Sequence, residues 1–156
     1  MMPQGPPTAA PIGLELASVS RAVGRAFDDA LSSAGGSRPT WLVLLSLKTR
    51  PMANQRELAA AVGIQGATLT HHLNAMESDG LLTRRRDPAN RRVHLVELTD
   101  AGEEAFHRLR LVAMEHDARL REGFSDEDLE RLRGLLGRLR ANVADGAGAS
   151  AGAATG

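Results

Sequence analysis

The chain has 156 residues, with nineteen basic and nineteen acidic side chains and so no net charge. This length suits one domain, and a neutral chain cannot coat nucleic acid through bulk positive charge. The absence of cysteine excludes a thiolate nucleophile, a disulfide framework and a cysteine-ligated zinc. No apolar run approaches the roughly 18 residues of a membrane span, and no signal peptide opens the chain. We therefore expect a soluble, cytoplasmic protein that makes no membrane contact.

Both ends of the chain have the composition of disordered tails. Residues 1–11 hold four prolines and no charged side chain, and residues 145–156 are almost all glycine and alanine. Such stretches bury too little apolar surface to offset the entropy lost on ordering. The sequence therefore predicts a single ordered domain over residues 12–144.

Two helices are expected at the start of this domain. From Ile12 to Ser33 the apolar residues recur at steps of three and four, which predicts an amphipathic helix that ends before Gly35. Pro39 suits the first turn of the next helix. That helix is apolar nearly all round and ends before Pro51, so we expect it to be central.

A pair of short helices follows. Asn54 with Glu57 three residues later forms a capping box that opens a helix over residues 54–62. Gly63 breaks this helix, and the next runs over residues 66–79. The two helices are therefore joined by a tight turn.

The pattern then changes to strands. Residues 81–86 and 92–98 read as two short strands joined by a turn-rich loop over residues 87–91. Thr99 or Asp100 caps a long helix to about Arg121, and a last helix starts after Ser125 and reaches about Val143. The order predicts a mainly α fold with a small β-hairpin wing.

Helix, turn, helix and then a two-stranded wing is a DNA-binding arrangement in which the second helix enters the major groove. At 100° per residue, Leu69, Leu73 and Met76 share one face of that helix, which must be core. The opposite face is small or polar, and acidic residues come only near the end of the helix. The DNA contacts expected from this helix and its start are Gln65, Thr68, Thr70, His71 and Asn74.

The hairpin adds positive charge. Residues 80–95 hold five arginines and one acid, Asp87, a local net charge of +4 in a neutral chain. An isolated arginine run is ordinarily a solvated face, but arginines beside a recognition helix reach phosphates or a narrow minor groove. This coincidence predicts binding of double-stranded DNA. The wing contacts expected are Arg84, Arg86, Asn90, Arg91 and Arg92.

Residues 54–102 resemble the winged helix-turn-helix core of the multiple-antibiotic-resistance regulator (MarR) family of bacterial transcription factors. The stretches that carry the resemblance are Glu57–Ala59, Thr68–Leu73, Gly80–Arg85, Asp87–Arg92 and Leu98–Gly102. The resemblance implies an obligate homodimer whose two winged domains read the half-sites of a pseudo-palindromic operator. It also implies a repressor that a small molecule, often an aromatic acid, relieves.

Two positions depart from the family pattern. Asn90 stands where the family usually has an aspartate paired with a wing arginine, so either the tip is looser or Asp87 substitutes. His71 stands where a longer donor is common, which bears on base preference.

The terminal helices predict the dimer without the family. Leucines of the last helix recur at steps of three and four residues. This spacing forms an apolar seam along one face of the helix, which needs a partner helix to cover it. The alternative is packing within the chain, but the small lobe over residues 39–98 can hardly bury both terminal regions, residues 12–36 and 99–144. The seam residues expected are Leu16, Val19, Val23, Leu129, Leu132, Leu136 and Leu139.

A small-molecule site is expected where the first helix meets the central one. Trp41 offers an apolar wall, and Arg21 and Arg25 lie near the same junction. One aromatic wall with one or two cations suits a small aromatic carboxylate. The alternative is that Trp41 is simple core and both arginines are solvated.

Metal binding and catalysis find little support. His107 and His116 are nine residues apart on one helix and face opposite sides. Glu103 and His107 offer only two ligands, whereas zinc takes three or four. There is no nucleophile motif, phosphate loop or HExxH motif, so we expect no enzyme, no metal and no cofactor.

The alternative to a DNA-binding regulator is a protein–protein adaptor, because winged helices also bind proteins. An adaptor, however, has no need of five arginines confined to one hairpin beside a helix face free of acids. Retention on heparin or random duplex DNA at low salt would separate the two.

Overall fold

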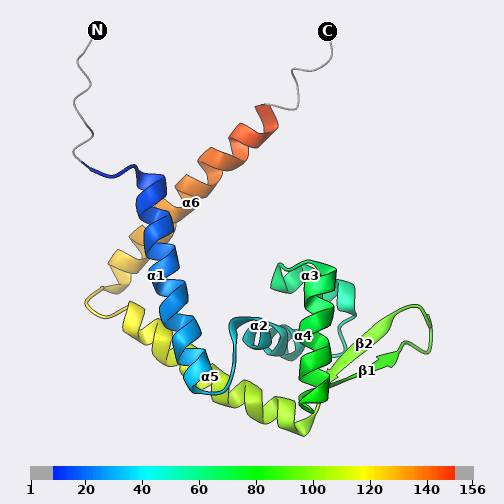
Figure 1. Cartoon of the computed structure of the whole chain (residues 1–156). Helices are drawn as coiled ribbons and strands as arrows, with labels where there is room; N and C mark the ends of the chain where they lie inside the picture. The colour runs from blue at the N-terminus through cyan, green and yellow to red at the C-terminus, as the bar shows by residue number, and fades with distance from the viewer. Residues whose placement is uncertain (1–8, 150–156) are drawn as a thin grey trace, which may run out of the picture. The chain divides into compact units, whose positions relative to one another are not determined.

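The computed structural model describes residues 9–149, with side chains to residue 144. Within this stretch the order is four helices, an antiparallel hairpin and two helices, as predicted (Figure 1). Contacts divide the chain into one compact unit that ends at His116 and a second that begins at Asp117. No described helix is both long and apolar enough to cross a bilayer. The elements are α1 (Ile12–Ser33), α2 (Arg38–Thr49), α3 (Gln55–Val62), α4 (Gly66–Ser78), β1 (Leu82–Arg86), β2 (His94–Leu98), α5 (Asp100–Leu120) and α6 (Asp126–Ala149).

The helix ends follow from their capping residues. Ser37 Oγ accepts a hydrogen bond from Thr40 N at 3.3 Å and opens α2. Asn54 Oδ1 accepts from Glu57 N at 2.8 Å, the expected cap of α3. Gly63 closes α3 with φ of 74°, a left-handed conformation that glycine adopts without strain.

The hairpin is paired from Leu82 with Leu98 at its base to Arg86 with His94. The second strand begins at His94 and not at residue 92 because the turn is longer, while the first begins one residue late because Leu81 N donates to Met76 O at 2.9 Å. Val93 O accepts from Asp87 N at 2.8 Å and Val93 N donates to Asn90 O at 2.9 Å, so the hairpin bonds pass into the turn at this residue.

The exit from the hairpin explains the glycine of the Leu98–Gly102 stretch. Thr99 Oγ1 accepts from Gly102 N at 3.1 Å and so caps α5. A Cβ atom on Gly102 would lie 2.0 Å from the backbone oxygen of Leu81. Only glycine lets α5 start this close to the backbone of Leu81, the residue before β1.

The core of the first unit is built around α2. Val43 and Leu44 are fully buried, and Trp41, 8 % exposed, stacks on Phe106 of α5 with ring centroids 5.6 Å apart. Leu69, Leu73 and Met76 of α4 are buried against this core, as predicted. The central place expected for the second helix is thus confirmed.

The second unit contains α6. A reciprocal capping box opens it, with Asp128 N donating to Ser125 Oγ and Ser125 N to Asp128 Oδ2, both at 3.1 Å. The helix continues to Ala149, past the predicted end near Val143, because extending a formed helix adds one hydrogen bond for each residue fixed, even through Gly146 and Gly148. The predicted tails fall largely on residues 1–8 and 150–156, which lie outside the described residues.

Candidate nucleic-acid interface

The exposed face of α4 carries most of the side chains predicted to read bases. Gln65, Thr68, His71 and Asn74 are all exposed, while the opposite face packs on the core. The helix stands between α3 and the hairpin (Figure 1). Its first turn contains no acid, and its N-cap Gln65 makes no capping bond with its side chain. Backbone N–H groups and short polar side chains are therefore available at the end that would meet DNA first.

Thr70, also predicted as a DNA contact, is half-buried and lies between the two short helices. Its Oγ1 accepts from Gln55 Nε2 at 2.6 Å and donates to Gly66 O at 2.9 Å. The hydroxyl therefore ties α3 to α4. A role for Thr70 in reading bases stays a prediction.

Arg84 is likewise half-buried and bonded to other side chains of the protein. Its side chain is 18 % exposed, its Nε donates to Glu77 Oε2 at 3.1 Å, and its Nη2 donates to Asn74 Oδ1. The hydrogen bond from Arg84 lowers the pKa of Glu77 below its ordinary value. This network fastens β1 to α4 and neutralises the acid nearest the exposed face. A contact between Arg84 and DNA stays a prediction, as does one from Asn74.

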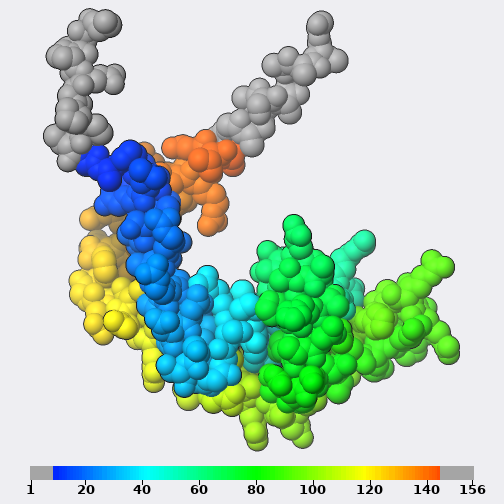
Figure 2. All heavy atoms as spheres, viewed as in Figure 1, coloured from blue at the N-terminus to red at the C-terminus, as the bar shows by residue number. Residues whose placement is uncertain are grey.

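Three wing arginines are free to meet a polyanion. Arg86, Arg91 and Arg92 are exposed, and no acidic side chain among the described residues lies within ion-pair distance of them. Arg85 differs, because its Nε lies 3.4 Å from Glu97 Oε2. The hairpin that carries the three projects from the rest of its unit (Figure 2).

The wing tip is held by its own side chains. Asp87 Oδ1 accepts from Ala89 N at 2.9 Å, and Asn90 Oδ1 accepts from Arg92 N at 3.2 Å. Both short side chains therefore stabilise turn backbone. In the described part of the chain, neither pairs with a wing arginine, so the tip is ordered without the ion pair typical of the family.

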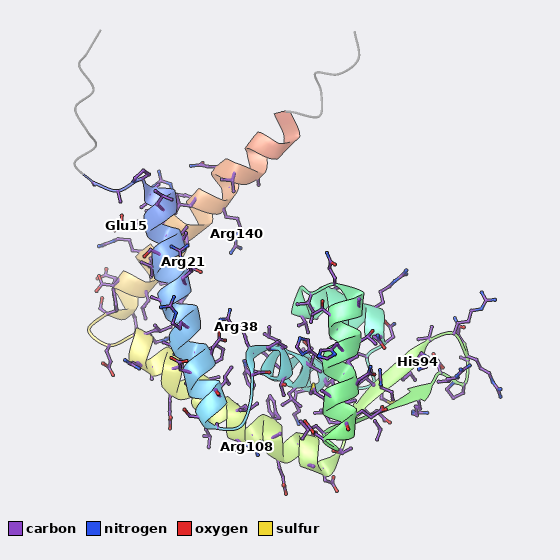
Figure 3. The ribbon with its side chains drawn as sticks, in the orientation of Figure 1. Glu15, Arg21, Arg38, His94, Arg108 and Arg140 are labelled. Carbon is purple, nitrogen blue, oxygen red and sulfur yellow. The ribbon has the colours of Figure 1, made fainter. Side chains whose placement is uncertain are left out.

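A hollow of about 430 Å³, which we call the α3–β2 hollow, lies between the start of α3 and the wing. It is lined by Asn54, Gln55, Arg56, Arg92, Val93 and His94. His94 lies on β2 (Figure 3). Arg56 and His94 were not predicted from the sequence, since they stand far apart in the chain. The bridge between Asn54 and Leu95 brings them together.

The residues predicted to bind a small ligand differ in their exposure to solvent. Arg21 and Arg25 are exposed on α1, and Figure 3 shows Arg21 on the upper half of that helix. Trp41 is buried and its ring is covered by Phe106. The cation that the structure places against α1 is Arg38, which donates to both carboxylate oxygens of Asp28 at 2.8 and 2.7 Å. The ligand site stays a prediction.

The predicted dimer residues divide by exposure. Leu16 and Val19 of α1 are exposed and Val23 is half-buried. In α6, Leu132 and Leu136 are exposed, and Leu129 and Leu139 are half-buried. Within residues 9–144, no three histidine, aspartate or glutamate side chains are placed to share a metal ion.

Known proteins match this chain in sequence and in fold. The model of the MarR family matches residues 37–94. The structure of the transcriptional repressor CouR bound to a 23-mer DNA duplex is similar, with 29 % identity, a TM-score of 0.75, and coverage of 83 % of this chain and 92 % of that one. A probable transcriptional regulator from Pseudomonas aeruginosa is 27 % identical with a TM-score of 0.72, over 83 % of this chain and 96 % of the other. PcaV from Streptomyces coelicolor, solved with its natural ligand, shares the fold at 21 % identity and a TM-score of 0.72, over 86 % of this chain and 97 % of that one.

Proposed function

Because this chain belongs to the MarR family of winged helix-turn-helix transcriptional regulators, we propose that it is a sequence-specific DNA-binding repressor and not an enzyme. It acts as a homodimer in the cytoplasm on a pseudo-palindromic operator. The observation that carries the proposal is the exposed face of α4, which carries no acidic side chain before Glu77, beside three wing arginines without acidic partners among the described residues. The similar repressor CouR is itself described bound to a DNA duplex.

The wing and the start of α3 hold the DNA backbone. Arg91 and Arg92 reach from the tip, and Arg92 also lines the α3–β2 hollow with Arg56 and His94. Two arginines around one hollow suit a phosphate, which positions the protein without reading sequence. Arg86 and Asn90 complete the wing contact on the same reasoning.

The face of α4 reads the bases. Gln65, Thr68 and His71 are exposed and not engaged in the internal networks, so they are free to meet base edges in the major groove. Thr70 and Arg84 act through Gln55 and Glu77, which set the angle of α4 against α3 and the wing.

Dimerisation supplies the second half-site. The apolar faces of α1 and α6 stay exposed in a single chain, including Leu16, Val19, Leu132 and Leu136. A second copy buries them, since apolar surface removed from water contributes about 25 cal/mol per Å². We place residues 12–36 and 99–144 in this interface.

A small aromatic acid is the proposed effector at Arg21, Arg25 and Trp41. It would favour a dimer whose recognition helices are wrongly spaced for the two half-sites. Salicylate should then quench Trp41 fluorescence and release operator DNA over the same concentration range. Quenching without release would mean that binding is not coupled to DNA.

The test of the function is selection of operators from random duplex DNA, followed by binding measured against salt. We expect a two-fold symmetric site with half-sites about one helical turn apart. Substitution of Thr68 or His71 should change which base is preferred, whereas Arg91→Ala should weaken all sequences alike. No retention on duplex DNA at low salt would favour the protein–protein adaptor instead.

A further inference from the structure

A groove of about 610 Å³ lies between α2 and α3, wholly within the unit that ends at His116. Its volume is that of a small-molecule site. The floor is aliphatic and contains no aromatic ring. The residues that form this floor are Leu45, Ala53, Leu58, Ala60 and Ala61.

The groove exists because a leucine faces alanines. Leu44 and Leu47 of α2 are 0 % and 3 % exposed, whereas Leu45 is 40 % exposed. Across from it, α3 presents Ala60 and Ala61, whose side chains are too short to cover it. An apolar body lying here would remove the exposed surface of Leu45 from water.

One end of the groove carries a cation that can change partner. Arg50 Nη1 lies 3.2 Å from Glu57 Oε2, and the Arg50 side chain is 69 % exposed, so this surface pair is weak. Glu57 also accepts from Asn54 Nδ2 at 2.8 Å. A second carboxylate can therefore bind the Arg50 guanidinium without leaving Glu57 unpaired.

The rest of the rim discriminates against more polar ligands. The Ser46 and Thr49 hydroxyls donate to the carbonyls of Leu42 and Leu45 at 2.7 and 3.0 Å, so they offer an incoming molecule only acceptor positions. Arg50 is the cation among the lining residues. A ligand with one carboxylate and an aliphatic chain matches these lining residues.

We propose that the α2–α3 groove binds an aliphatic monocarboxylate of about six to ten carbons, with its chain on Leu45, Ala60 and Ala61 and its carboxylate on Arg50. This site is separate from Arg21, Arg25 and Trp41. Through Gln55 and Thr70, α3 is bonded to α4, so occupancy acts on the recognition helix. That effect on DNA rests on the proposed function, but the binding itself does not.

The test is calorimetry on the full chain without DNA. Affinity should rise about fourfold for each added methylene from hexanoate to octanoate. Arg50→Gln should lower octanoate affinity about tenfold and leave octanol affinity unchanged. Ala61→Leu fills the groove and should weaken both ligands, while melting curves check that each variant is folded.

Lys48→Gln is the matched control, because Lys48 lies in the last turn of α2 beside Arg50 but pairs with Glu103 and does not line the groove, so this variant should bind octanoate as the parent does. Loss of octanoate binding in this control would overturn the proposal, as would equal affinity in Arg50→Gln, no dependence on chain length, or no binding. A change of sedimentation in Ala61→Leu would also overturn it, since the groove would then receive a second copy of the chain. None of these results depends on DNA binding.

Discussion

Leucine side chains form a buried core in one unit of this molecule and stay at the surface of the other. In the unit that ends at His116, Leu31, Leu44, Leu69 and Leu73 are fully buried. In the unit that begins at Asp117, no described side chain is buried, and Leu132, Leu135 and Leu136 are 44 %, 48 % and 40 % exposed. Apolar periodicity therefore predicts that a helix has an apolar face, but it does not say what covers that face.

The space around individual glycines also differs between the two units. Gly102 is pressed against the carbonyl of Leu81, whereas nothing lies within 4 Å of a Cβ placed on Gly134 or Gly137 of α6. The packing at Gly102 leaves no space for a side chain, whereas the surface of α6 at Gly134 and Gly137 has room for a partner. The following experiments test whether that room is filled by a second copy.

The largest effect should come from Leu132→Asp combined with Leu136→Asp. Charges on the apolar face of α6 should yield monomers or aggregates, and a single half-site has too few contacts for specific affinity. We expect operator affinity to fall at least about a thousandfold, toward nonspecific binding. Analytical ultracentrifugation and operator titration measure the two effects, and a folded dimer of normal affinity would place the interface elsewhere.

Gly102→Ala should have the next largest effect. The new Cβ would collide with backbone and not with a movable side chain, so unfolding free energy should fall by about 3 kcal/mol, at the upper end for overpacking. Gly137→Ala is the matched control and should gain about 0.5–1 kcal/mol from helix propensity. Denaturant unfolding gives both values. If Gly137→Ala instead dissociates the dimer, α6 approaches its partner closely at that point.

Arg91→Ala and Arg92→Ala should each cost about 1–3 kcal/mol in operator binding, with a salt slope lower by about one unit per subunit. Both arginines are exposed on the wing and lack acidic partners among the described residues. Lys48→Ala, which removes a cation of α2 outside the proposed DNA and dimer contacts, is the control and should change neither quantity. Unchanged affinity in both wing variants would rule out a wing contact.

The smallest effect concerns pH. Because Arg84 holds the pKa of Glu77 below its ordinary value of about 4.5, the ionised pair stabilises the fold above that pH. The contribution is lost as the pH falls through the lowered pKa. Glu77→Gln should therefore show a slightly shallower loss of stability on acidification. Carboxyl NMR titration should also find the Glu77 pKa nearer its ordinary value in Arg84→Gln, and no change there would contradict the network.

The sequence alone determined the secondary structure of the winged helix-turn-helix, residues 39–98. Caps at Asn54 and Thr99, breaks at Gly63 and Gly80, and the buried face at Leu69, Leu73 and Met76 are local signals that depend on residues within one or two turns. The same local signals placed the wing and its arginines. The end of α6 was missed because Gly146 and Gly148 are stop signals in the sequence, whereas the helix continues through them to Ala149.

Only the tertiary structure decided which polar side chains are free to meet DNA. Thr70, Asn74 and Arg84 look like unpaired surface residues in the sequence. In the structure, Thr70 is bonded to Gln55 of α3, and Arg84 of β1 is bonded to both Asn74 and Glu77 of α4. Arg56, in turn, is brought to Arg92 by one bridge to the second strand. Pairings between residues far apart in the chain depend on how the elements pack, and periodicity within one element contains no information about them.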